Sequence, residues 1–292
     1  MEPIVYLNGG FVPHREARIS ADDRGFLFGD GVYEVIRAVD GALFEAGAHA
    51  RRMAAGLQAL RIGSLEGGAH ALLGVAERLL RENALLEGEA TVYLQVTRGA
   101  APRRHTFPAP STPPTVYVSA TRFQPPAELQ EHGAAAITQA DVRWGRCNVK
   151  STNLLPNILA KQLAAEAGAF EAILVRDGVV TEGASTSVFG VSRGELRTHP
   201  LTPHILPGIT RAVVLELAAA RGLRVDETPL RGAELGRLDE IFLVGTTTDL
   251  MPVVVLDGTP VGGGSPGPVT RALQQGYRAR FHGAARSLLL ST

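Results

Sequence analysis

Lys150 and Glu182 are residue types that could together hold a cofactor with a reactive aldehyde. Lys150 stands just ahead of a predicted helix start, with Arg146 close in sequence, and Glu182 follows Thr181 in a predicted glycine-bounded turn. A pyridine aldehyde cofactor needs a covalent amine anchor and an anionic partner for its ring nitrogen. Burial near another cation helps a lysine to lose the proton that blocks this chemistry. We therefore expect Lys150 to be the anchor and Glu182 the ring partner, although each residue alone could be an ordinary solvated side chain.

A phosphate group could bind at two other places in the sequence. Ile209 and Thr210 open a predicted helix directly after Gly208, and free N–H groups at a helix start attract phosphate. Thr246 begins a run of threonines that follows an apolar strand. Arg52 could add a cation through a two-pronged contact. Capped helix and strand ends, and a solvated helix arginine, are the plainer interpretations of these segments.

The elements that must position these residues form two unequal parts. In the first part, the pattern predicts strands at 4–7, 32–39, 91–97 and 115–121, and helices at 48–61 and 70–82. In the second part, it predicts strands at 172–175, 187–191 and 240–244, and helices at 154–167 and 209–221 that end at Gly168 and Gly222. We expect an α+β or α/β chain with a small N-terminal domain (1–120), an interdomain linker (121–133) and a large C-terminal domain (134–292).

Composition and charge exclude several classes of partner. Twenty-nine basic residues balance twenty-nine acidic ones, so the sequence shows no electrostatic footprint for nucleic acid or an anionic membrane. We expect small-molecule substrates. Cys147 is the only cysteine, which excludes an intrachain disulfide and fits a cytoplasmic location. We expect neither a membrane span, which needs about 20 apolar residues, nor a metal site, since the eight histidines are scattered.

Short segments along nearly the whole chain resemble one enzyme family. They read DRGF at 23–26, FGDGVYE at 28–34, QVTRG at 95–99, RW at 143–144, KS at 150–151, NLL at 153–155, LAKQ at 159–162, TEG at 181–183 and GITR at 208–211. In this order they resemble the fold-type IV pyridoxal-phosphate aminotransferases, and most closely the D-amino-acid branch. The resemblance implies a two-domain fold whose larger C-terminal domain has a mixed, barrel-like sheet. It also implies that pyridoxal 5'-phosphate binds between the domains.

The resemblance implies a role for each candidate residue. Lys150 is similar to the Schiff-base lysine, Glu182 to the partner of the ring nitrogen and Arg52 to the phosphate arginine. Ile209, Thr210 and Thr246 are similar to phosphate ligands, Leu206 to the apolar residue against the ring, and Tyr33 to the tyrosine that faces the substrate carboxylate. Two departures from the pattern are Gly245 and Ser187, where the relatives tend to carry serine and asparagine.

The loop after residue 100 resembles a carboxylate-binding loop. Arg103 and His105 stand two apart, so in an extended chain they face the same way and could converge on one anion, while Arg104 points elsewhere. In the family this loop reaches the neighbouring subunit, so the resemblance implies a homodimer. The second arginine leaves open a preference for dicarboxylates.

The implied activity is transfer of an amino group from a D-amino acid to a 2-oxo acid by a ping-pong mechanism. Lys150 would carry the proton of the substrate α-carbon as general base and acid. Three alternatives stay open: a branched-chain L-amino-acid aminotransferase, an aminodeoxychorismate lyase on the same scaffold, and a protein that binds the cofactor without turnover.

Overall fold

The chain folds into two compact units that are not simple consecutive halves of the sequence. The computed structural model describes residues 2–63 and 65–289. The first unit contains the chain up to Gln124, the segment Val149–Asn153 and the last part of the final helix, from Phe281 onward. The second unit contains Pro125–Asn148 and Leu154–Arg280. Lys150 therefore belongs by its contacts to the first unit, although the sequence analysis assigned it to the C-terminal domain. Chain order alone could not predict this, because the segment joins the first unit through backbone hydrogen bonds.

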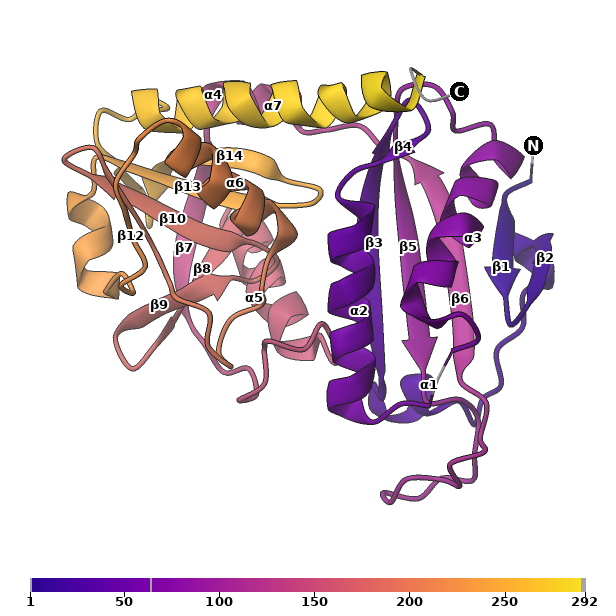
Figure 1. The fold of residues 1–292 in the computed structure, drawn as a ribbon. Coiled ribbons are helices and arrows are strands. Elements are labelled where there is room, and N and C mark those ends of the chain that lie inside the picture. Colours follow the sequence, from indigo (N-terminus) through magenta and orange to yellow (C-terminus); the bar gives the residue numbers. More distant parts are fainter. Residues whose placement is uncertain (1, 64, 290–292) are drawn as a thin grey trace. The chain divides into compact units, whose positions relative to one another are not determined.

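The first unit is built on an antiparallel sheet with the strand order β2-β1-β6-β5-β3-β4. Its strands are β1 (Ile4–Leu7), β2 (Gly10–Pro13), β3 (Gly31–Val39), β4 (Ala42–Leu43), β5 (Glu89–Thr97) and β6 (Thr115–Arg122). Two helices, α2 (Ala46–Leu60) and α3 (Gly68–Glu82), cover one face of this sheet (Figure 1). The predicted strands and helices of the first part are confirmed.

Alternation along the strands decides which face of this sheet is buried. In β5, Ala90, Val92, Leu94 and Val96 are almost fully buried, while the residues between them are only partly covered. They pack with apolar residues of α2 and α3 that recur every three or four positions, such as Met53. The side chains of β3 that share this face must therefore be apolar or paired.

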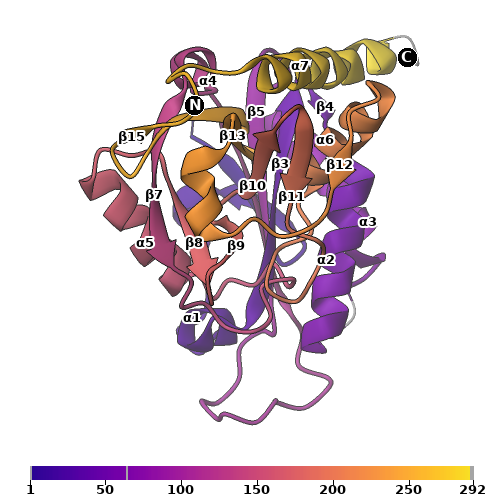
Figure 2. The same ribbon diagram turned by 90° about the vertical axis from the view of Figure 1, so that its left-hand side faces the viewer.

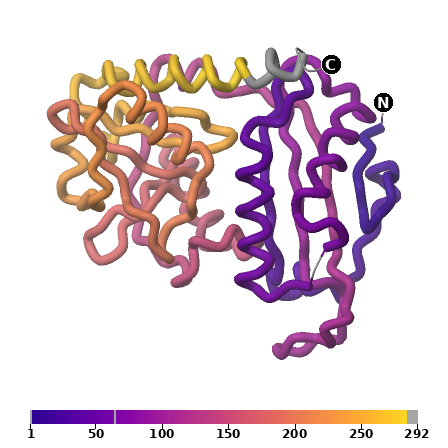
Figure 3. The backbone as a smooth tube through the Cα atoms, in the orientation of Figure 1, coloured from indigo at the N-terminus to yellow at the C-terminus, as the bar shows by residue number. Residues whose placement is uncertain are grey.

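A short helix that the sequence analysis missed lies beside the end of β5. Helix α1 (Arg24–Phe28) begins at Asp23, whose carboxylate accepts from the N–H of Gly25 at 2.8 Å. A Cβ on Gly25 would lie 2.3 Å from the Thr97 side chain, so this approach of helix to strand requires glycine. At five residues, α1 is too short to show helical periodicity. The connection 98–114 between β5 and β6 starts here and extends past the end of the sheet (Figure 3).

The second unit contains a mixed sheet with the order β12-β11-β10-β13-β14-β7-β8-β9, and β15 pairs with β14. Its strands are β7 (Ala134–Ala140), β8 (Glu171–Arg176), β9 (Val179–Gly183), β10 (Ser187–Ser192), β11 (Glu195–Thr198), β12 (Val225–Asp226), β13 (Glu240–Gly245), β14 (Asp249–Leu256) and β15 (Thr259–Pro260). β7 runs parallel to β8 and β14, whereas β10, β13 and β14 pair antiparallel. Helix α5 (Leu155–Glu166) packs outside β7 and β8, and α6 (Ile209–Ala220) packs on β13 (Figure 2).

The predicted elements of the second part are confirmed, and several others were missed. Helices α5 and α6 end near Gly168 and Gly222, both with φ of +68°. The missed elements are β7, β9, β11, β12, β14, β15, α4 (Ala127–His132), α7 (Pro268–Leu289) and the 3-10 helix Gly232–Arg237; in the first part, the 3-10 helix His14–Glu16 was also missed. Strand β7 is rich in alanine and β14 contains Pro252, which both weaken a strand pattern.

The boundary between the two units, at Gln124 and Pro125, falls within the predicted linker, whereas the predicted turn at Glu182 is wrong. The range 121–133 holds the end of β6 and all of α4, where the buried Gln130 donates to the Thr248 carbonyl at 3.1 Å. Glu182 lies within strand β9, not on a turn; the turn is Asp177-Gly178, which joins β8 to β9. Its place in a strand buries Glu182, which a turn at the surface would not.

The described residues include no helix that is long and apolar enough to cross a membrane. They also include no group of three or more His, Cys, Asp or Glu side chains that could hold a metal ion.

Candidate active site

Lys150 is held beside β3 by backbone hydrogen bonds. Its carbonyl accepts from the N–H of Tyr33 at 3.0 Å, and the N–H of Thr152 donates to the Gly31 carbonyl at 3.0 Å. Ser151 forms an antiparallel bridge with β3 between these two contacts. The segment Val149–Asn153 thus behaves as a short extra strand, and its register fixes which β3 residue is next to Lys150.

That register places the Lys150 amine against Tyr33. Lys150 Nζ lies 3.3 Å from the Tyr33 hydroxyl and 4.3 Å from its ring centroid. The Tyr33 ring stacks on Tyr93 at 5.8 Å. Burial, and then the neighbouring Tyr33 and Tyr117, raise the pKa of Tyr93 to about 12, so Tyr93 stays neutral at pH 7. The structure therefore brings together two predicted site residues, Lys150 and Tyr33.

Arg52 is locked in a buried ion pair that the sequence analysis did not predict. Its Nε donates to Glu34 Oε1 at 2.7 Å and its Nη2 to Glu34 Oε2 at 2.8 Å. The Nδ1 of His49 lies 2.8 Å from Glu34 Oε2. Burial opposes ionisation of Glu34, but the hydrogen bonds and charge of Arg52, with those of His49, hold its pKa at about 2. Glu34 thereby orients Arg52 and uses two of its five N–H donors.

The alternation of buried residues along β3 and the spacing on α2 could have predicted the pairing of Glu34 with His49. Glu34 lies on β3 between Val32 and Ile36, on the face that β3 buries against α2. A buried carboxylate requires a partner. His49 and Arg52 lie three apart on α2, so both can face the same carboxylate. The pKa of His49 is lowered, because the effect of burial outweighs the opposite effect of its contact with Glu34.

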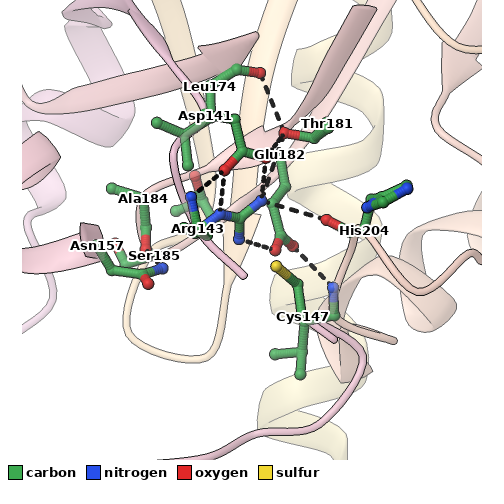
Figure 4. Close-up of polar contacts among 12 residues, drawn as sticks. Asp141, Arg143, Cys147, Asn157, Leu174, Thr181, Glu182, Ala184, Ser185 and His204 are labelled. Carbon is green, nitrogen blue, oxygen red and sulfur yellow. Dashed lines mark hydrogen bonds and ion pairs between the residues drawn. The ribbon is translucent and has the colours of Figure 1, made fainter. Parts of the chain in front are cut away.

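Glu182 belongs to a buried network of charged side chains in the second unit. Arg143 donates to Glu182 Oε1 from Nη1, and holds Asp141 through Nε and Nη2, each at 2.9 Å (Figure 4). Thr181 donates to Asp141 at 2.8 Å. The backbone N–H of Leu206 donates to Glu182 Oε2 at 3.0 Å. Two predicted residues, Glu182 and Leu206, are therefore in direct contact.

The partners of Asp141 keep its carboxylate ionised. Burial opposes ionisation of Asp141, but its hydrogen bonds with Arg143 and Thr181 lower its pKa to about 2. Burial likewise favours neutral Arg143, yet its hydrogen bonds and charge interactions with Asp141 and Glu182 raise its pKa above the usual value. Cys147 lies close by, and burial raises the pKa of its thiol. The site offers a Glu182 carboxylate whose orientation is fixed by the ion pair with Arg143 and by the Leu206 N–H, as a partner of a protonated pyridine nitrogen requires.

The start of α6 has the features of a phosphate site. Gly208 precedes α6 without any side chain that caps the helix, so the first N–H groups have no partner within the helix. A Cβ on Gly208 would lie 2.9 Å from Ser187 Oγ, so glycine keeps this place open. Thr210 is buried, and its hydroxyl has no hydrogen bond with any described residue. These donors match an anion at a helix N-terminus.

Thr246 lies next to the same place in the second unit. Ser187 pairs with Val244 at the end of the β10–β13 ladder, and Thr246 follows β13 by one residue. Ser187 thus lies beside Gly208, which precedes Ile209 and Thr210, and opposite the end of β13, which precedes Thr246.

Arg103 and His105 lie in the exposed connection between β5 and β6. Both contact Phe28: the Arg103 guanidinium is 5.1 Å from the ring centroid, and the His105 ring is 5.8 Å away in an edge-to-face arrangement. The two predicted carboxylate-binding residues are thus neighbours in space, within the same unit as Lys150.

The comparison with protein families identifies the class of this chain. The family model described as "Amino-transferase class IV" matches residues 31–256. The chain belongs to the class IV aminotransferases, and its mixed α+β architecture is the fold of that class.

Individual relatives are similar over almost their full length. The chain is 41% identical to a D-alanine aminotransferase of Staphylococcus epidermidis, over 94% of this chain and 96% of the relative. It is 43% identical to the D-alanine aminotransferase of Bacillus licheniformis, over 92% and 94%. Among solved structures, the branched-chain amino acid aminotransferase of Escherichia coli has a TM-score of 0.90 at 27% identity, over 97% and 96%. A second branched-chain amino acid aminotransferase, solved in complex with N-(5'-phosphopyridoxyl)-L-glutamate, has a TM-score of 0.87 at 29% identity, over 97% and 95%.

Proposed function

We propose that this protein is a D-amino-acid aminotransferase that moves an amino group from a D-amino acid, such as D-alanine, to a 2-oxo acid in a ping-pong cycle. The observation that carries the transaminase assignment is the position of Lys150. The chain contains two lysines, and the other, Lys161, is bound to Glu171 and to the Phe170 carbonyl. Lys150 alone is beside a tyrosine hydroxyl in the register that β3 sets.

Pyridoxal 5'-phosphate is the cofactor of the class IV aminotransferases, and it supplies an electron sink for the substrate α-carbon when it is bound. The residues described above fit it: an amine, an oriented carboxylate and an open helix start. The proposed contacts are Lys150 as the Schiff-base anchor, Glu182 at the ring nitrogen, Leu206 at the ring face, and Arg52, Ile209, Thr210 and Thr246 at the phosphate.

Lys150 has a second task as the proton carrier. With the cofactor bound, Lys150 Nζ would act as general base and acid toward the proton of the substrate α-carbon. The Tyr33 hydroxyl, 3.3 Å away, orients the amine by hydrogen bonding. The ion pair with Arg143 fixes the Glu182 carboxylate, which would face the ring nitrogen and favour its protonated form.

The preference for D-amino acids rests on the carboxylate pair. Arg103 and His105 lie together against the Phe28 ring and could offer two donors to one carboxylate. The side on which the carboxylate is held decides which face of the α-carbon meets Lys150. D-alanine aminotransferases that are 37–43% identical to this chain support the same choice.

A homodimer in which this loop serves the neighbouring subunit is part of the proposal. Helix α5 supports it with an exposed apolar stripe at three- and four-residue spacing, made of Leu155, Ile158, Leu159 and Leu163. Such a stripe on an exposed surface is typical of an interface. A cytoplasmic location, suggested by the single cysteine, also remains a prediction.

A branched-chain L-amino-acid aminotransferase is the second candidate, because solved enzymes of that type share the fold with a TM-score of 0.90. Purified protein is assayed with D-alanine or L-leucine plus 2-oxoglutarate, and with aminodeoxychorismate alone. We expect turnover of D-alanine to dominate. Faster turnover of L-leucine would refute the D preference, and release of pyruvate from aminodeoxychorismate without an acceptor would indicate a lyase.

A further inference from the structure

The loop that carries Arg103 and His105 is fastened where it leaves β5. Arg98 donates to both oxygens of Asp30, at 2.8 and 2.9 Å, and Arg24 donates to Asp30 Oδ2 at 2.8 Å. Burial opposes ionisation of Asp30, but the hydrogen bonds from the two arginines outweigh it and lower its pKa. The first residue of the loop therefore cannot move independently of α1.

Arg24 also holds the backbone in the middle of the loop. Its Nη1 donates to the Arg104 carbonyl at 2.6 Å and lies 3.4 Å from the Thr106 carbonyl. These two contacts fix the backbone on both sides of His105, and the backbone bends at Arg103, His105 and Thr106. The segment is therefore not the extended chain that the sequence analysis assumed, and the Arg103 and His105 side chains lie together because both contact the Phe28 ring.

Phe28, the last residue of the same short helix, packs against both of these side chains. The guanidinium of Arg103 lies 5.1 Å from its ring centroid and that of Arg24 lies 4.7 Å away. The His105 ring meets it edge to face at 60°. Among the described residues, the Arg104 side chain has no hydrogen bond, ion pair or ring contact.

We propose that Phe28 and Arg24 are positioning residues for substrate recognition, which present Arg103 and His105, and not Arg104, as a preformed pair to a single carboxylate. The proposal rests on the proposed function, since it assumes that this pair binds the substrate carboxylate. Neither Phe28 nor Arg24 touches the substrate; Arg24 sets the path of the backbone and Phe28 sets the side-chain orientations.

The benefit to binding is entropic. An exposed arginine loses rotamer freedom when it binds an anion, and a side chain that is already ordered avoids much of that loss. Cation–π and edge-to-face contacts at exposed sites are weak individually. Removal of the Phe28 ring should therefore weaken carboxylate binding by about tenfold, which corresponds to about 1.4 kcal/mol.

Propionate, which has a carboxylate and no amino group, is the probe. Its inhibition constant against D-alanine is measured for the holoenzyme and for the Phe28→Leu variant. We expect the constant to rise about tenfold, the KM for D-alanine to rise in parallel and kcat to change by less than about twofold. An unchanged inhibition constant would overturn the proposal. Phe28→Met, equally apolar and ring-free, gives the same test where Phe28→Leu fails to accumulate.

A double-mutant cycle separates positioning from a general structural effect. In an Arg103→Leu background, Phe28→Leu should weaken propionate binding by less than about threefold, because the side chain that it positions is gone. A full tenfold effect in that background would show that Phe28 acts independently of Arg103.

Two neighbouring residues give matched controls. Phe26→Leu removes an exposed ring of α1 that makes no ring or cation contact with a described residue, and should leave the propionate constant unchanged. Arg104→Leu should change it by less than about threefold, since a distant exposed charge acts weakly. If Arg104→Leu weakened propionate binding more than Arg103→Leu did, Arg104 and not Arg103 would bind the carboxylate, and the proposal would be overturned. Wild-type protein without D-alanine turnover would instead refute the proposed function.

Discussion

The Glu34–Arg52 ion pair allows a quantitative prediction, because both side chains are buried and neither has access to much water. Glu34 is 1% exposed and its pKa is held at about 2, against an ordinary 4.5. At about 1.4 kcal/mol per pKa unit, this difference corresponds to about 3 kcal/mol of stability at pH 7. Glu34→Gln removes the charge and leaves the Arg52 guanidinium without its counter-ion, so we expect a loss of about 3 kcal/mol.

The dependence on pH has a defined sign. The folded-state pKa of Glu34 lies below the unfolded value, so its contribution is fully present above pH 4.5 and is lost as the pH falls toward about 2. The difference in unfolding free energy between wild type and Glu34→Gln should therefore shrink through this window. Asp141, whose pKa is also about 2, titrates equally in both proteins and cancels from the difference.

The assay is urea unfolding of the cofactor-free proteins at several pH values between 7 and 3. Glu77→Gln is the matched control, because Glu77 is an exposed glutamate of α3 with no ion pair among the described residues, and it should stay within about 0.5 kcal/mol of wild type. A loss below about 1 kcal/mol for Glu34→Gln at pH 7, or a difference that does not shrink on acidification, would refute the reasoning.

Two further predictions concern cofactor affinity, measured by equilibrium dialysis of pyridoxal 5'-phosphate. Arg143→Leu leaves Glu182 buried without its cation, so its carboxyl tends to stay protonated; we expect the dissociation constant to rise about 10- to 100-fold, and unchanged affinity would contradict the role of the pair. Gly208→Ala places a methyl group 2.9 Å from Ser187 Oγ. We expect the dissociation constant of the cofactor to rise about tenfold in Gly208→Ala, and a second substitution, Ser187→Ala, to reverse part of this rise. If Gly208→Ala alone bound the cofactor like wild type, the start of α6 would not be the phosphate site.

Much of the fold was predictable because its larger elements carry regular apolar patterns. The alternation in β5 and the three- and four-residue spacing in α2 and α3 each identify an element and its buried face. Elements without such a pattern were missed. Helix α7 is rich in arginine and glutamine and contains Gly276, so neither its composition nor its periodicity indicates a buried helix.

The candidate site was predictable for residues whose chemistry is rare and less so for those that orient them. Lys150 and Glu182 are identified by residue type and local context, whereas the partners of Glu182 depend on contacts between distant strands. Asp141 and Arg143 follow β7, and they reach Thr181 and Glu182 of β9 only because β8 lies between β7 and β9. Pairing of strands far apart in sequence cannot be inferred from local spacing.

The bond between Lys150 and the cofactor is the central claim, and borohydride trapping tests it most directly. Reduction of the holoenzyme fixes the cofactor to its lysine, and mass spectrometry of the digested protein then locates the added mass. With two lysines in the chain, the outcome is unambiguous. The mass should appear on the peptide that contains Lys150, persist in Lys161→Arg and vanish in Lys150→Ala. Modification of Lys161 in the wild type, or labelling that survives in Lys150→Ala, would contradict the account.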